Sequence, residues 1–225
     1  MRLALLHSPF VGAFCWSGLA PLLRARGHDV VVPKISLAGP PYYPRIAQSV
    51  ADEIGTKRVL IAHSGAGALV PVIAQVSGAR GAIFVDAILP HPGRSWFDTA
   101  PQALATHLRN IATENLLPVW EYWFASGTLA RLLPDAAMRD AFRSELKPTP
   151  LAYCEENAPI VEFSGPCAYL ILSEGYTAEM DAACAAGFAV AALELHHLAM
   201  LTHAAEVAAA LDRLLAPFET GGTRN

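Results

Sequence analysis

The fold is decided by the stretch Arg58-Val59-Leu60-Ile61-Ala62-His63-Ser64-Gly65-Ala66-Gly67-Ala68-Leu69-Val70. Its apolar beginning predicts a buried strand, and the small residues that follow are compatible with a helix. Ser64 stands at the junction, where a tight turn lifts its hydroxyl out of the backbone and brings the N–H of Gly65 to the same point. Ala62 and Ala66 replace the outer glycines of the usual Gly-x-Ser-x-Gly pattern, and alanine is the smallest side chain compatible with that turn. The stretch predicts a nucleophilic serine, and the alternative is that Ser64 only caps the following helix.

Length and composition favour one domain. The chain has 225 residues, of which 53% are hydrophobic and 16% charged, so it can bury a substantial core without metals or disulfides. The net charge is -4 and the 16 basic residues are scattered, which argues against nucleic acid or an anionic membrane as partner. The apolar run at residues 1–6 is too short for a signal peptide, and none approaches ~20 residues. We therefore expect a cytoplasmic protein with no membrane association.

The four cysteines lie far apart and have no C-x-x-C spacing, which disfavours zinc and disulfide sites. They are expected to be ordinary buried thiols: Cys15, Cys154, Cys167 and Cys184.

Short β-branched runs alternate with amphipathic segments, a pattern typical of a parallel sheet covered by helices on both faces. The expected strands are residues 3–6, 29–32, 58–61, 82–85, 168–172 and 189–193. Ser17 is a candidate N-cap for a helix that Gly27 ends, the closing helix is expected at about 204–215, and 219–225 is expected to be a frayed tail.

One region, about 91–165, interrupts this alternation. It has no convincing strand, but it has helical stretches rich in bulky aromatic residues. Inserted after the strand that ends in Asp86, it would form a helical cap above Ser64, at the strand ends where α/β proteins bind ligands. Trp96, Trp120 and Trp123 are candidate substrate contacts, and the alternative is that they fix the cap to the body.

A nucleophilic serine needs a base, and His196 and His197 follow the last expected strand and precede the final helix. A serine first and a histidine near the end of the chain is the order of the α/β-hydrolases. One of the two is expected to be the base, with a hydrogen-bonded structural role as the alternative. His63 is expected to support the turn at Ser64.

The sequence resembles a small α/β-hydrolase, similar to the group that contains plant methylesterases and hydroxynitrile lyases. The resemblance rests on residues 6–16, 19–23 and 27–28 at the first strand and helix, and on His197-Leu198-Ala199-Met200-Leu201. It implies a mostly parallel sheet flanked by helices, and it favours His197 over His196 as the base.

The resemblance also implies a carboxylate that orients the imidazole, within Ser173-Glu174-Gly175-Tyr176-Thr177, but no aspartate stands there. Glu174 is one candidate. Asp86 is the preferred one, because a carboxylate at the end of a buried strand is costly without a partner such as His197. The alternative for Asp86 is that it caps backbone N–H groups.

A second departure concerns the oxyanion hole. The resemblance implies that Gly65 N–H is one donor, but the position of the other donor is Pro9, which has no N–H. Losing one donor costs ~3 kcal/mol of transition-state stabilisation. Either Phe10 N–H or the Ser8 hydroxyl substitutes, or the reaction develops no oxyanion there; Ser8 as a simple turn residue is the alternative.

We therefore expect a serine hydrolase that cleaves a small or medium apolar ester, lactone or thioester through an acyl-Ser64 intermediate, with no metal or organic cofactor. One alternative is a lyase, cyclase or dehydratase that uses Ser64 and His197 for acid-base chemistry. Another is a ligand-binding protein on a degenerate scaffold. The expected binding partner is a small-molecule substrate, and the sequence is compatible with a homodimer.

Overall fold

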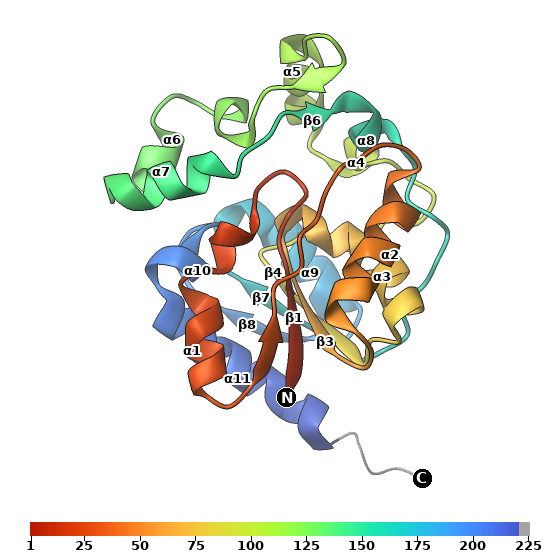
Figure 1. Cartoon of the computed structure of the whole chain (residues 1–225), viewed down its shortest axis with the longest axis vertical. Coiled ribbons are helices and arrows are strands. Elements are labelled where there is room, and N and C mark those ends of the chain that lie inside the picture. Colours follow the sequence, from red (N-terminus) through yellow and green to blue (C-terminus); the bar gives the residue numbers. More distant parts are fainter. Residues whose placement is uncertain (221–225) are drawn as a thin grey trace.

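The computed structural model describes residues 1–220 and has a six-stranded parallel sheet at its centre (Figure 1). The strand order is β2-β1-β3-β4-β7-β8. Strands β3 and β4 lie in the middle of the sheet and pair in register, with His63 opposite Val85, so the residues after both strands emerge side by side at the carboxyl edge. The strands are β1 (Arg2–Leu6), β2 (Asp29–Val31), β3 (Val59–His63), β4 (Gly81–Val85), β7 (Cys167–Ile171) and β8 (Ala189–Ala192).

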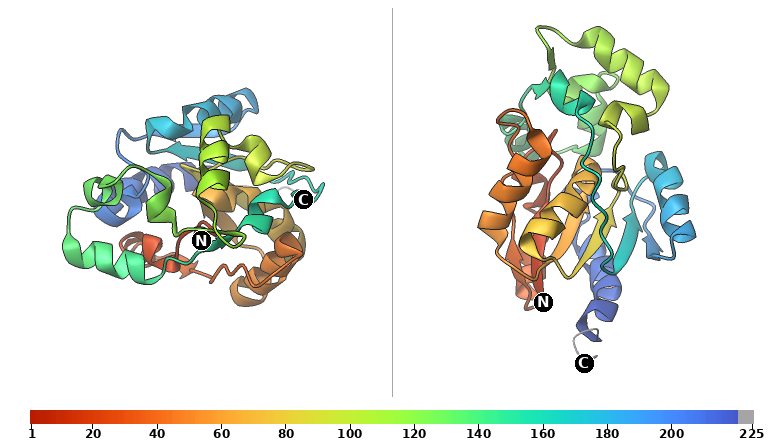
Figure 2. Two further views of the ribbon diagram at one scale, coloured as in Figure 1. Left: turned by 90° about the horizontal axis from the view of Figure 1, so that it is seen from above. Right: turned by 90° about the vertical axis from the view of Figure 1, so that its right-hand side faces the viewer.

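Helices cover both faces of the sheet (Figure 2). Helix α1 packs against α11, and α2 packs against α3. These helices are α1 (Leu19–Ala25), α2 (Tyr42–Ile54), α3 (Val70–Ser77), α9 (Thr177–Ala185), α10 (Ala199–Thr202) and α11 (Ala204–Thr220). The mostly parallel sheet flanked by helices that the sequence predicts is therefore confirmed.

Some helix boundaries differ from the sequence expectation. Helix α1 begins at Leu19 after Gly18, so Ser17 is not its N-cap, whereas Gly27 adopts the expected left-handed conformation with φ +86°. Helix α11 continues to Thr220, beyond the expected end at residue 215, because the buried Phe218 extends its apolar face. It therefore includes residues 219–220 of the expected tail, and residues 221–225 lie outside the described part.

The segment between β4 and β7 lies above the carboxyl edge of the sheet, in green in Figures 1 and 2. Its helices are α4 (Trp96–Thr99), α5 (Gln102–Ile111), α6 (Thr128–Leu132), α7 (Ala136–Ser144) and α8 (Leu151–Glu155). Contrary to the expectation of no strand, β5 (Leu116–Leu117) and β6 (Thr149–Pro150) pair antiparallel. Two residues are too few for a period-two pattern to be visible in the sequence.

The cysteines are not all buried. Cys15 and Cys154 are buried, Cys167 is half-buried and Cys184 is exposed, so the expectation is wrong for the last. Cys184 lies in α9, a helix dominated by small residues that has no clear apolar face to indicate which side is buried.

Among residues 1–220, no helix is both long and apolar enough to cross a membrane.

Candidate active site

The turn after β3 holds Ser64 in a strained backbone conformation. Its φ is +57°, in the left-handed region that non-glycine residues seldom adopt. The chain then enters the 3-10 turn η2 (Ser64–Leu69), which continues into α3. The N–H of Ile88 donates to the carbonyl of Ser64 over 3.2 Å, and a Cβ on Gly67 would lie only 1.8 Å from the carbonyl oxygen of Ile88. The small residues of this turn therefore let the loop after β4 lie against it.

Asp86 follows β4 and is fully buried, with φ +45°. Its Oδ1 accepts hydrogen bonds from the N–H groups of Leu172 and Ser173, both over 2.9 Å. Its Oδ2 accepts from the Ser173 hydroxyl over 2.6 Å and from Nδ1 of His197 over 2.8 Å. A buried carboxylate with this many donors stays ionised and fixes the imidazole.

Two opposing effects act on the pKa of Asp86. Burial acts to raise the pKa of this carboxyl, but the hydrogen bond and the charge of His197, together with the donors at Ser173 and Leu172, hold the pKa below its usual value. Because Asp86 is anionic, Nδ1 of His197 carries the proton that it donates, and Nε2 is left with a lone pair.

A second histidine positions the loop of His197. Nε2 of the buried His63 donates to the backbone carbonyl of His197 over 2.9 Å, and the two rings lie 4.4 Å apart between centroids. Burial, followed by the nearby His197, lowers the pKa of His63 well below its usual value, so His63 is neutral. His196, by contrast, bonds the Thr202 hydroxyl over 2.8 Å.

Tyr176 is a site residue that sequence reasoning missed. Its phenol lies 3.3 Å from Oγ of Ser64, and its ring stacks on His197 with 5.0 Å between centroids and 3° between planes. Within the described part of the chain, no hydrogen bond joins Ser64 directly to His197. The only available signal was an aromatic residue in the loop after a central strand, which no periodic pattern marks.

The structure separates the two candidate carboxylates. Glu174 lies in the 3-10 turn η4 (Glu174–Tyr176) and is exposed, and no hydrogen bond or ion pair joins its side chain to another described residue. Asp86 contacts His197, and it also caps backbone N–H groups. Those groups belong to the loop after β7 and not to the loop that follows Asp86 itself.

The candidate oxyanion region brings Ser8, Phe10 and Gly65 together. The N–H of Phe10 donates to Oγ of Ser8 over 3.4 Å, so this N–H already has an acceptor. A Cβ on Gly65 would lie 2.9 Å from the same Oγ, which puts the Ser8 hydroxyl close to the Gly65 backbone.

These residues open into a cavity of about 450 Å³ below the β4–β7 segment. Ser64, Tyr176 and His197 form part of one wall, and Trp96, Trp120 and Trp123 all line it as well. The remaining lining is largely apolar and includes Phe10, Ile88, Ala100, Pro101, Leu104, Phe124 and Leu132. Phe10 contacts two of the tryptophans, with ring centroids 5.3 Å from Trp96 and 4.8 Å from Trp123. All three tryptophans therefore line the cavity, and Trp96 and Trp123 also join the segment to the body through Phe10.

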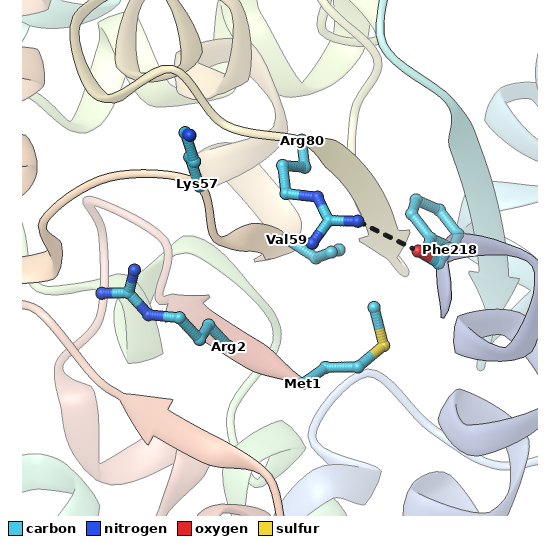
Figure 3. A pocket seen from close by; sticks show the side chains of 6 residues that line it. All are labelled: Met1, Arg2, Lys57, Val59, Arg80 and Phe218. Carbon is cyan, nitrogen blue, oxygen red and sulfur yellow. Dashed lines mark hydrogen bonds between the residues drawn. The ribbon is translucent and has the colours of Figure 1, made fainter. Parts of the chain in front are cut away.

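A second cavity, of about 480 Å³, lies at the opposite edge of the sheet (Figure 3). It is lined by Met1, Arg2, Lys57, Val59, Arg80 and Phe218. Arg80 donates to the carbonyl of Phe218 over 3.5 Å, and the described residues that line this cavity carry no hydroxyl, thiol, imidazole or carboxylate side chain. The cavity at Ser64, by contrast, brings together a hydroxyl, a phenol and an imidazole. In the portion that the structure describes, no group of three or more His, Cys, Asp and Glu side chains could hold a metal ion.

The chain matches one protein family and is similar in fold to several solved structures. Residues 3–210 match the model of the Alpha/beta hydrolase family. The comparison with curated proteins gave no match. Among solved structures, the chain is similar to an extracellular α/β-hydrolase from a Paenibacillus species, described as sharing structural and functional homology with tobacco Salicylic Acid Binding Protein 2. The TM-score is 0.75 at 20% identity over 94% of this chain and 98% of the other.

Two further solved structures share the fold. A variant of polyneuridine aldehyde esterase gives a TM-score of 0.71 at 18% identity and covers 95% of this chain and 98% of its own. A variant of tomato methylketone synthase I, complexed with beta-ketoheptanoate, gives a TM-score of 0.68 at 14% identity and covers 96% of this chain and 98% of its own.

Proposed function

Because this chain belongs to the alpha/beta hydrolase family, we propose that it hydrolyses a small or medium apolar ester, lactone or thioester through an acyl-Ser64 intermediate. The observation that carries the proposal is the hydrogen bond of 2.8 Å between the buried Asp86 and His197, whose imidazole lines the same cavity as the strained Ser64. The names of two structural neighbours, a hydrolase and an esterase, support the same reaction class.

In the first step, Nε2 of His197 takes the hydroxyl proton of Ser64 while Oγ forms a bond to the substrate carbonyl carbon. The C–O or C–S bond to the leaving group then breaks, and that group receives the proton from His197. Asp86 stabilises the imidazolium that exists between these proton transfers. Water repeats the sequence on the acyl-enzyme and releases the acid.

Apo geometry is compatible with this mechanism although Ser64 and His197 are not hydrogen-bonded to each other. Catalytic hydrogen bonds of this kind often form only when substrate binds. The largely apolar cavity favours an apolar acyl or alkyl group, and the β4–β7 segment would act as the cap that excludes water from it.

For the oxyanion hole we propose the N–H of Gly65 and the hydroxyl of Ser8. Pro9 supplies no N–H, and the N–H of Phe10 is already bonded to Oγ of Ser8. That bond uses a lone pair of the hydroxyl oxygen and leaves its proton free to donate toward Gly65, where the oxyanion would form. Phe10 then acts through Ser8, while its ring lines the cavity.

The second candidate is a lyase, cyclase or dehydratase in which Ser64 and His197 act only as acid and base. It is favoured by the departure at Pro9 and by the contact of Ser64 with Tyr176 instead of His197. The two candidates differ in whether Ser64 ever carries an acyl group.

A fluorophosphonate probe followed by peptide mass spectrometry tests the proposal. We expect rapid labelling of Ser64, together with turnover of p-nitrophenyl butyrate that Ser64→Ala abolishes. Ser144→Ala is the matched control, because Ser144 is exposed in α7 and its hydroxyl bonds, among the described residues, only Ala141 of its own helix. Slow or absent labelling of a folded wild-type protein would favour the acid-base candidate, and tight ligand binding without turnover would favour a binding protein.

A further inference from the structure

Tyr176 is joined to both halves of the Ser64–His197 pair. Its phenol makes its one hydrogen bond among the described residues to Oγ of Ser64, over 3.3 Å. Its ring lies parallel to the imidazole of His197. The stacking fixes the ring, and so it fixes the direction in which the phenol points.

Either hydroxyl could be the donor in this bond, and the phenol has a proton to donate. Burial raises the pKa of Tyr176 well above its ordinary value, so the group keeps its proton throughout the neutral pH range. A protonated phenol that donates to Oγ leaves the proton of Ser64 free for His197. The arrangement is therefore compatible with the activation of Ser64.

We propose that Tyr176 is a catalytic residue that donates a hydrogen bond to Oγ of Ser64 and acts mainly in deacylation. This inference rests on the acyl-Ser64 mechanism proposed above. In deacylation, His197 takes a proton from water, and the water oxygen bonds to the acyl carbon. The bond between that carbon and Oγ then breaks, its electron pair moves to Oγ, and the proton on His197 follows. The proton of Tyr176 stays on the phenol throughout.

Electronic demand distinguishes the two half-reactions. In acylation Oγ is the nucleophile, and a hydrogen bond to its lone pair has two opposing effects. It lowers the nucleophilicity of Oγ, and it makes the hydroxyl proton of Ser64 easier to remove. In deacylation Oγ is the leaving group and gains negative charge, so the same hydrogen bond becomes charge-assisted. A hydrogen bond of that kind is expected to change a rate by about tenfold to a hundredfold.

The test is Tyr176→Phe, which keeps the ring on His197 and removes only the hydroxyl. Rapid mixing with p-nitrophenyl butyrate separates acylation, seen as a burst of nitrophenol, from deacylation, seen as the later steady rate. Tyr43→Phe is the matched control. Its hydroxyl is buried and has no hydrogen-bond partner among residues 1–220, and Tyr43 packs on Tyr153 in the β4–β7 segment.

We expect Tyr176→Phe to keep the burst rate within about threefold of wild type and to slow the steady rate at least about tenfold, so that acyl-enzyme accumulates and KM falls together with kcat. Equal slowing of both phases, or wild-type rates in both, would overturn the proposed role. If wild-type protein forms no acyl-Ser64 at all, the proposed function fails. If the wild-type protein shows a burst and Tyr176→Phe has the same rates, the proposed function stands and only the role of Tyr176 is refuted.

Discussion

Replacing Asp86 by asparagine gives the sharpest test of the site. Oδ1 of the amide can still accept from Leu172 and Ser173, so the shape of the loop is kept. Its NH₂ group takes the place of Oδ2, which in the native protein accepts a hydrogen bond from Nδ1 of His197 over 2.8 Å. Two donors cannot face each other, so the imidazole changes tautomer, and Nε2 carries the proton in place of a lone pair.

An imidazole in that tautomer cannot take the proton of Ser64. The expected loss in kcat is therefore about 10⁴-fold, the cost of the wrong tautomer in a Ser-His-Asp triad, which corresponds to about 5 kcal/mol of activation free energy. The assay is steady-state hydrolysis of p-nitrophenyl butyrate near neutral pH, with thermal unfolding as the check that the variant is folded.

The matched control is Glu174→Gln, which makes the same chemical change at the exposed carboxylate on the neighbouring loop. We expect it to keep turnover within about threefold of wild type, the small change typical of an exposed side chain that makes no contact with the imidazole. The reasoning is refuted if folded Asp86→Asn keeps turnover within about tenfold of wild type. It is equally refuted if Glu174→Gln loses as much activity as Asp86→Asn.

Three other outcomes are expected. Gly67→Ala puts a Cβ 1.8 Å from the carbonyl oxygen of Ile88, so urea unfolding should show a loss on the order of 1–3 kcal/mol; unchanged stability would mean that the loop after β4 moves freely. Folding lowers the pKa of His63, so as pH falls the unfolded chain binds a proton at this histidine before the folded protein does. The contribution of neutral His63 to the free energy of unfolding is therefore complete above pH 6.5, the ordinary pKa of histidine. Below that pH it is lost by about 1.4 kcal/mol per pH unit. Urea unfolding across this range should show a shallower pH dependence for His63→Gln, and equal slopes would count against a neutral His63. Leu132→Ala enlarges the cavity, so kcat/KM over a series of p-nitrophenyl esters should shift toward longer acyl chains; an unshifted profile would place the acyl group elsewhere.

The sequence predicted those parts of the molecule that depend on neighbouring residues. The turn at Ser64 follows from an apolar strand and small residues in direct succession, and all six expected strands are present with small shifts at their ends. Helix α2 was missed although its buried side chains follow helical spacing, because Gly39, Pro40 and Pro41 before it suggest a loop.

The parts that could not be predicted depend on contacts between distant segments. Asp86 and Glu174 follow the neighbouring strands β4 and β7, and only the folded chain decides which of them contacts His197. Tyr176 lies 112 residues from Ser64 and belongs to no periodic pattern. The contact of Phe10 N–H with Ser8 depends on a turn geometry that Pro9 permits but does not specify.

The placement of Asp86 directly after β4 divides the site between two halves of the chain. Ser64 and Asp86 both precede the helices of the β4–β7 segment, whereas His197 and Tyr176 both follow them. A protein cut between those helices would therefore carry the proposed nucleophile and acid on one fragment and the proposed base on the other. Because neither fragment holds a complete triad, ester hydrolysis would report the reassembly of two separately produced halves, which makes the fold a candidate for a split-enzyme sensor of protein association.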